Sequence, residues 1–191
     1  LFIGDGSGSV GTLNLSGSSA MSVGGIQLGV TAGTGTLNLN GGTLTVNGNI
    51  TNGTGVGTFN FNGGTLRAGV SSATFMTNVT TANVNAGGAI IDSGANAITI
   101  AQPLLDGGGA LVKLGSGTLT LSGANTYSGS TTISNGTLVI NGSVAGAVTV
   151  RPGTTLGGNG TVAGVVNVQP GASIGAGTSI GKLTLGSSPV L

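Results

Sequence analysis

Three aspartates are the only acidic residues of this 191-residue chain, and they are the first candidates for chemistry. Two carboxylates a few ångströms apart hydrolyse glycosidic bonds, and one carboxylate beside a cation serves as a base. Asp92 and Asp106 lie 14 positions apart, less than the shortest repeat of the chain, so we expect them on different faces. Asp5 and Asp106 each precede a glycine, which is typical of turns. We therefore expect no catalytic residue and no enzyme activity.

Residues 6–11 (GSGSVG) match the glycine pattern of a dinucleotide-binding turn. That turn needs a preceding strand, a following helix and an acid roughly 20 residues further on. The sequence offers none of these, and a chain with 42 glycines produces such matches by chance. We expect no cofactor.

The few aromatic side chains could form a platform for a sugar ring, and rows of threonine could bind ice. Tyr127 is the one aromatic residue with a polar group, whereas Phe59 and Phe61 alternate with polar residues as buried strand residues do. Core packing of the phenylalanines, with Tyr127 in a turn, is therefore favoured over a sugar platform. Thr118 and Thr120 are typical of the ice-binding pattern, but threonine is not confined to one repeated face.

The charge and the missing residue types exclude several partners. The formal net charge is +1, and the chain has no His and no Cys. Nucleic-acid binding depends on Lys and Arg at phosphates, and four isolated cations are too few for a groove. Soft metal ligands are absent, and three scattered aspartates cannot build repeated calcium-binding turns. No apolar run has the length of a membrane span. We expect no nucleic acid, no metal and no direct membrane span.

The composition favours an all-β chain. Only 4% of the residues are charged, against roughly a quarter in an ordinary domain. Each interior glycine costs a helix about 1 kcal/mol, and the glycines lack the every-third-residue spacing of collagen. An apolar fraction of 38% argues against disorder.

One phrase recurs in the first half of the chain: glycine, threonine, then two apolar residues separated by a polar one. It is GTLNL at 11–15 and 35–39 and GTFNF at 57–61, and a companion phrase stands at 42–46 (GTLTV) and 64–68 (GTLRA). Within each phrase the apolar residues point to one face of a strand and the polar ones to the other.

Related phrases continue at shorter spacing in the second half. They are GTLTL at 117–121, GTLVI at 136–140, GAVTV at 146–150, GVVNV at 164–168 and GKLTL at 181–185. Hairpins compete as an explanation, because Asn-Gly pairs favour hairpin turns, but they do not predict the same phrase every 17–24 residues. Stacked coils about 4.8 Å apart do.

We therefore predict an all-β fold, a single-stranded right-handed parallel β-helix (a β-solenoid) of about nine coils; the handedness follows from the usual crossover rule. It forms one domain, 1–191, with coils of about 23 residues in 1–70, less regular coils in 71–116 and coils of about 18 residues in 117–191. The expected core ladder consists of Leu13, Leu15, Leu37, Leu39, Phe59, Phe61, Leu119, Leu121, Leu138, Ile140, Val148, Val150, Val166, Val168, Leu183 and Leu185.

The longest glycine-free stretch, 70–86, interrupts the repeats. Phe75, Met76 and Val79 are spaced as in one helical turn. An irregular loop that packs Phe75 over the core is the alternative.

Residues 107–142 (GGGALVKLGSGTLTLSGANTYSGSTTISNGTLVING) resemble the autotransporter-associated β-strand repeat of bacterial passenger domains and related giant surface proteins. The matching elements stand at 111–113, 117–121, 124–129, 131–133 and 136–138, and together with similar closing coils the resemblance covers about half of the chain. It implies a right-handed β-helix, export, and a place at the cell surface or beyond it. It implies no catalytic residue.

These observations favour a non-catalytic structural rod of a secreted or cell-surface bacterial protein. The rod would serve as a stalk, or as a subunit that stacks on itself head to tail into a filament, because we see no capping element at either end of the sequence. The alternative is an adhesin-type module that binds a glycan or a host surface through an outward aromatic or polar cluster. A third possibility is a polysaccharide-active enzyme that depends on Asp92 or Asp106.

Overall fold

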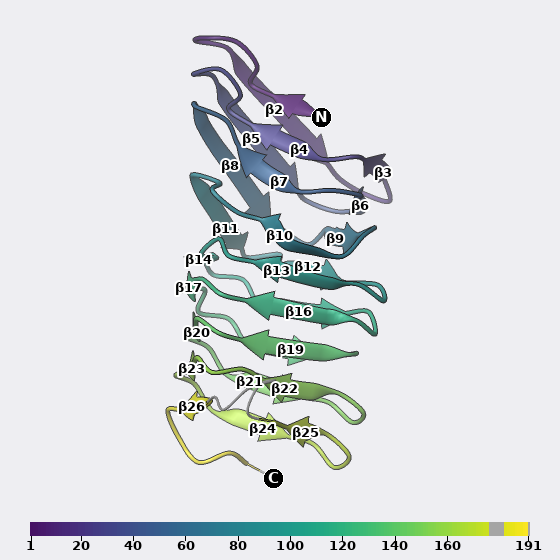
Figure 1. Ribbon diagram of the computed structural model, residues 1–191, viewed down its shortest axis with the longest axis vertical. Helices are drawn as coiled ribbons and strands as arrows, with labels where there is room; N and C mark the ends of the chain where they lie inside the picture. Colours follow the sequence, from purple (N-terminus) through teal and green to yellow (C-terminus); the bar gives the residue numbers. More distant parts are fainter. Residues whose placement is uncertain (176–181, 191) are drawn as a thin grey trace.

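Parallel strands make up the regular structure of the chain. The computed structural model describes residues 1–175 and 182–190, and the described residues form 26 strands and no helix. The strands stack into a β-solenoid of about eight turns (Figure 1), which confirms the predicted architecture. The predicted segment 117–191 includes residues 176–181 and 191, which lie outside the described part.

Four parallel sheets line the solenoid. The nine-stranded sheet contains β1 (Phe2–Ile3), β4 (Ile26–Leu28), β7 (Ile50–Asn52), β10 (Ser72–Met76), β13 (Ala97–Ile100), β16 (Thr118–Leu121), β19 (Thr137–Ile140), β22 (Thr155–Gly157) and β25 (Ser173–Ile174). The eight-stranded sheet contains β3 (Ala20–Val23), β6 (Thr43–Val46), β9 (Thr65–Ala68), β12 (Ala89–Asp92), β15 (Leu111–Leu114), β18 (Thr131–Ile133), β21 (Val148–Val150) and β24 (Val166–Val168).

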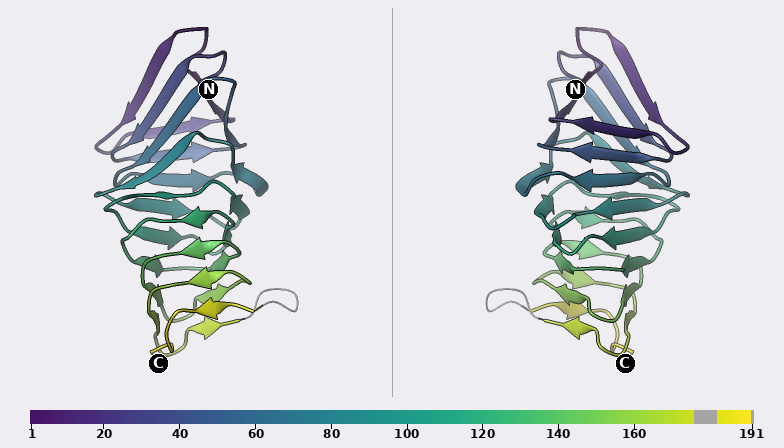
Figure 2. Two further views of the ribbon diagram at one scale, coloured as in Figure 1. Left: turned by 90° about the vertical axis from the view of Figure 1, so that its left-hand side faces the viewer. Right: turned by 90° about the vertical axis from the view of Figure 1, so that its right-hand side faces the viewer.

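The third face of the solenoid changes along its length. Its first part is a five-stranded sheet of β2 (Val10–Leu15), β5 (Thr34–Leu39), β8 (Val56–Phe61), β11 (Thr81–Asn85) and β14 (Leu105–Gly107). A four-stranded sheet follows, made of β17 (Ala124–Asn125), β20 (Ser143–Val144), β23 (Thr161–Val162) and β26 (Thr184–Leu185). The coils therefore become smaller toward the C-terminal end (Figure 2).

The repeated phrase lies in register from coil to coil. Gly11 pairs with Gly35, which pairs with Gly57, so the three copies of the phrase form vertical rows. Glycine is required in these rows, because a Cβ atom on Gly35 would stand 2.2 Å from the carbonyl oxygen of Ile3. The sequence repeat is thus converted directly into rows of like side chains on each face.

Apolar rows fill the interior. The residues of the expected ladder that are buried are Leu15, Leu37, Leu39, Phe59, Phe61, Leu119, Leu121, Leu138, Ile140, Val148, Val150 and Val166. Those that are partly buried and pack against this core are Leu13, Val168, Leu183 and Leu185. The partly buried residues belong to the first and last described coils, which have a neighbouring coil on one side.

The stretch 70–86 contains two strands, β10 and β11, so the helical turn is wrong and so is the irregular loop, although Phe75 does pack into the core. β10 pairs with β7 and β13, and its register shifts between Ser72 and Met76. This bulge lets two successive side chains, Phe75 and Met76, both enter the core, where each is fully buried. The neighbouring strands supply backbone partners that an isolated helical turn would lack.

Candidate functional site

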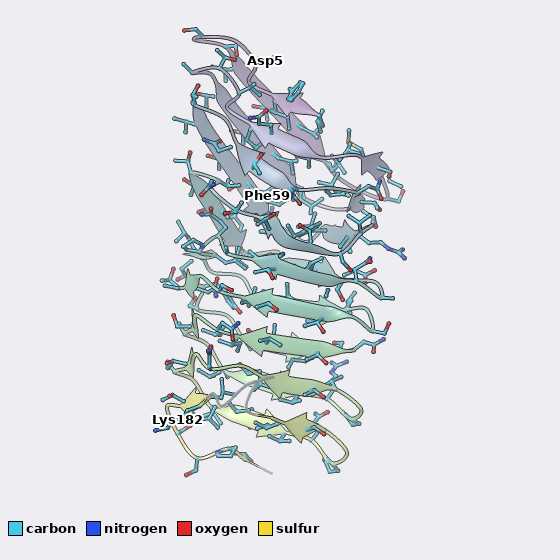
Figure 3. All side chains as sticks on the ribbon, in the orientation of Figure 1. Asp5, Phe59 and Lys182 are labelled. Carbon is cyan, nitrogen blue, oxygen red and sulfur yellow. The ribbon has the colours of Figure 1, made fainter. Side chains whose placement is uncertain are left out.

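The three aspartates do not meet. Asp5 follows β1 near the N-terminal end, and Lys182 lies near the opposite end (Figure 3). Asp92 ends β12 in the eight-stranded sheet, whereas Asp106 lies on β14 in the five-stranded sheet, so the two are on different faces as predicted. Within residues 1–175 and 182–190, no group of three or more acidic, His or Cys side chains could hold a metal ion.

Two of the carboxylates have structural partners. The Asp92 carboxylate lies 3.6 Å from Nε of Arg67 on the neighbouring strand and accepts a hydrogen bond from the Gly94 amide. The Asp106 carboxylate accepts bonds from the Gly108 amide and from the Ser128 amide and hydroxyl, at 2.8–3.0 Å. The Ser128 and Gly108 amides, followed by the Ser128 hydroxyl, hold the pKa of Asp106 below its usual value. The Asp106 side chain therefore connects its own turn to the next coil by hydrogen bonds.

The glycine pattern at 6–11 leads from β1 into β2, which is a strand. Gly6 and Gly8 have φ values of 105° and 73°, so the pattern supplies a tight turn. A dinucleotide turn requires a helix at this point, to place its N-terminus against the phosphates.

Most aromatic rings are inside the solenoid. Tyr127 is fully buried, and its hydroxyl lies 2.7 Å from Oγ1 of Thr131. Burial raises the pKa of Tyr127 to about 12. Phe59 and Phe61 are also fully buried, with ring centroids 4.6 Å apart. These buried rings cannot stack on a sugar in solution. The ring of Phe2 is different, because this residue is 63% exposed.

Lys113 is one of the four cations that stand isolated in the sequence, and its side chain is fully buried. It occupies an inward position of β15, in register with Ile91 and Ile133 of the adjacent coils. Its ammonium donates to the carbonyl oxygens of Leu114 and Gly115, each at 2.8 Å, and to that of Asn135 at 3.2 Å. Burial lowers the pKa of Lys113 to about 8, and the negative charge of Asp92 opposes this shift.

Asn125 joins three coils from the inside. Its side-chain oxygen accepts from the amide of Leu104, and its side-chain nitrogen donates to the carbonyls of Gly123 and Ser143, all at 2.9–3.0 Å. Since β17 has only two residues, these bonds replace ladder bonds that a longer strand would make.

An asparagine ladder runs along the outward face of the five-stranded sheet. The side-chain nitrogen of Asn38 donates to Asn14, that of Asn60 to Asn38, and that of Asn83 to Asn60, at 2.7–2.8 Å. Asn14, Asn38 and Asn60 occupy the same place in the repeated phrase. Asn83 lies outside the phrase but is in register with Asn60, so stacking brings all four amides into hydrogen-bond distance.

The threonine pattern forms two short rows on the nine-stranded sheet. One row contains Thr118, Thr137 and Thr155 and is bounded by Ala97 and Ser173. The other pairs Thr99 with Thr120 and ends at Val139.

A known family model matches the part of the chain that contains the buried polar residues. Residues 111–140 match the family model of the passenger-associated-transport-repeat. This match and the β-solenoid fit an autotransporter passenger repeat family. No curated protein and no solved structure matches the chain. Passenger repeats occur in secreted or surface proteins of bacteria, and a passenger-type structural domain fits the solenoid.

Four polar residues of the matched stretch are turned inward. Lys113, Asn125, Tyr127 and Thr131 all lie within 111–140, and all four are buried and hydrogen-bonded. These side chains connect the corners of the solenoid, where strands end and ladder bonds are missing.

The described part of the chain also contains no helix that is long and apolar enough to cross a membrane.

Proposed function

We propose that this chain is a rigid, non-catalytic stalk segment of a secreted or surface-exposed passenger protein. The observation that carries the proposal is the path of the chain, which climbs coil by coil so that its first and last described coils lie at opposite ends of the solenoid (Figure 1). Eight steps of about 4.8 Å give a rod of about 40 Å. Such a segment sets the distance between whatever is attached to its two ends.

Three kinds of contact between successive coils make the solenoid stiff. Parallel backbone ladders run along every face, aliphatic rows fill the interior, and buried polar side chains join the corners. The carboxylates of Asp92 and Asp106 take part in the same connections. This use of the acidic side chains supports a structural role over a catalytic one.

Head-to-tail stacking into a filament is the second form of this proposal. It would place the six-residue strand β2 of one copy against two-residue strands such as β26 of another. Because the two end coils differ in size, identical copies would pair few of the exposed backbone groups. The taper of the solenoid therefore favours the stalk over the filament.

A pair of spin labels measures the stiffness directly. The chain has no cysteine, so Thr12→Cys with Thr161→Cys accepts labels at two exposed sites on β2 and β23. For this pair we expect one narrow distance distribution centred near 35 Å. When Ser122→Cys replaces Thr161→Cys, the component of the label-to-label distance along the solenoid axis should be about 10 Å shorter. A broad distribution for both pairs would contradict a rigid rod.

Sedimentation of the unlabelled chain over a range of concentrations separates the two forms. Monomers at all concentrations support the stalk, and fibres support the filament. Turnover of a pectin-like polysaccharide that disappears in Asp92→Ala or Asp106→Ala would overturn the non-catalytic assignment.

A further inference from the structure

A shallow hollow of about 330 Å³ lies on the first strands of the nine-stranded sheet. The residues that line it include Phe2, Gln27, Asn49 and Thr51. Ligand sites are concave, lined by aromatic and apolar groups, and carry a few polar groups that orient the ligand. A volume near the lower end of the usual range suits one or two sugar rings.

Strand register brings three of these side chains into one outward row. Phe2 on β1 is opposite Gln27 on β4, which is opposite Thr51 on β7. Their neighbours Ile3, Ile26 and Leu28 face the core and are buried. The row therefore presents a ring, an amide and a hydroxyl at steps of about 4.8 Å.

The polar groups of the row are available for a ligand. Among the described residues, neither the Gln27 amide nor the Thr51 hydroxyl has a side-chain hydrogen-bond partner. Asn49, in contrast, is held in place by Ser72, which donates to its oxygen at 2.7 Å, and by Thr74, which accepts from its nitrogen at 3.3 Å. The Asn49 side chain is thus ordered by hydrogen bonds within the protein, whereas the side chains of Gln27 and Thr51 are available to bond a ligand.

The chemistry of the lining selects an uncharged, hydroxyl-rich ligand. No lining side chain is charged. The negative face of a phenylalanine ring attracts the slightly positive C–H bonds of a pyranose. Amide and hydroxyl groups both donate and accept hydrogen bonds, as sugar hydroxyls do.

We propose that this hollow is a binding subsite for a neutral carbohydrate, with Phe2 as the stacking surface and Gln27 and Thr51 as the hydrogen-bonding partners. Phe2 is suited to this task because it is exposed, whereas Phe59, Phe61, Phe75 and Tyr127 are fully buried. The subsite does not depend on the stalk proposal, since it uses one face of the first coils and not the length of the rod.

Saturation-transfer NMR on the full chain tests the subsite, with cellobiose and chitobiose as neutral probes and galacturonic acid dimers as the acidic probe. We expect transfer to the neutral disaccharides only. Phe2→Ala should weaken binding about tenfold, the value of a good aromatic contact, and Gln27→Ala should weaken it less. Phe2→Trp should strengthen binding, because it enlarges the stacking surface.

Val10→Ala is the matched control. Val10 belongs to the same end of the solenoid and is 77% exposed, but it lies on β2 in the five-stranded sheet. Binding unchanged in Val10→Ala supports the subsite. Absence of transfer to either neutral probe, or equal losses in Phe2→Ala and Val10→Ala, would overturn it. A Phe2→Ala variant that alters only the sedimentation of the chain would also overturn it, because Phe2 would then belong to a protein contact.

Discussion

The ammonium of Lys113 donates to the carbonyl oxygen of Asn135, 3.2 Å away on the next coil. The same nitrogen donates to Leu114 and Gly115 at the corner that follows β15, so one buried charge connects two successive turns of the solenoid. A lysine in a row of isoleucines is thereby accommodated, because three carbonyl dipoles replace the water that the ammonium loses.

Removal of this amine should loosen the corner. We expect Lys113→Met to lower the free energy of unfolding by about 1–3 kcal/mol, because corner carbonyls lose their donor while the methionine fills the same space. Urea unfolding followed by circular dichroism measures the difference. Lys182→Met is the control. Because Lys182 is exposed, this variant should leave the free energy of unfolding unchanged. Equal stability of Lys113→Met and the parent chain would show that the carbonyls need no donor.

Stability should pass through a maximum near pH 10. The pKa of Lys113 is about 8 when folded and 10.5 in its ordinary state, so the unfolded chain binds more protons between these values. The free energy of unfolding therefore rises with pH in this window. The pKa of Tyr127 is about 12 when folded against 10.0 ordinarily, so stability is lost as the pH rises from 10 to 12.

Denaturant unfolding at pH 7 to 12 tests both arms of this profile. Lys113→Met should remove the rise and leave the fall, whereas Tyr127→Phe should remove the fall and leave the rise. A flat profile in the parent chain would contradict both assignments.

The buried pair of Tyr127 and Thr131 should be coupled. Tyr127→Phe leaves the Thr131 hydroxyl without its partner and should cost about 1–2 kcal/mol. The double variant with Thr131→Val removes both polar groups and should be more stable than the sum of the single changes implies. Additive losses in this double-mutant cycle would mean that the 2.7 Å contact contributes nothing of its own.

The asparagine ladder predicts a difference between a middle and an end rung. Asn38→Ala breaks two amide contacts, whereas Asn14→Ala breaks one. Because these side chains are at the surface, we expect losses of about 1 and about 0.5 kcal/mol, respectively, in thermal unfolding. A larger loss for Asn14→Ala would rule out the ladder as the source of the effect.

The sequence by itself determined the solenoid, because a phrase that returns at a nearly constant interval leaves stacking as the arrangement that buries every copy alike. The alternation within GTLNL also assigned faces to Leu37 and Asn38, which are a buried residue and an outward rung. The placement of Asp92 and Asp106 on different faces followed from their spacing.

Tertiary structure alone decided the roles of the polar residues. Alternation along 111–114 (LVKL) places Lys113 on the inward face. Only the path of the corner after β15 and of the next coil shows that three carbonyl groups point toward its ammonium. The bulge in β10 likewise depends on β7 and β13, which lie about 25 residues away in sequence. The outward direction of Phe2 depends on its pairing with β4. In each case the deciding partner is a backbone group whose direction is set by a corner of the solenoid or by another coil, and a local sequence pattern carries no information about that direction.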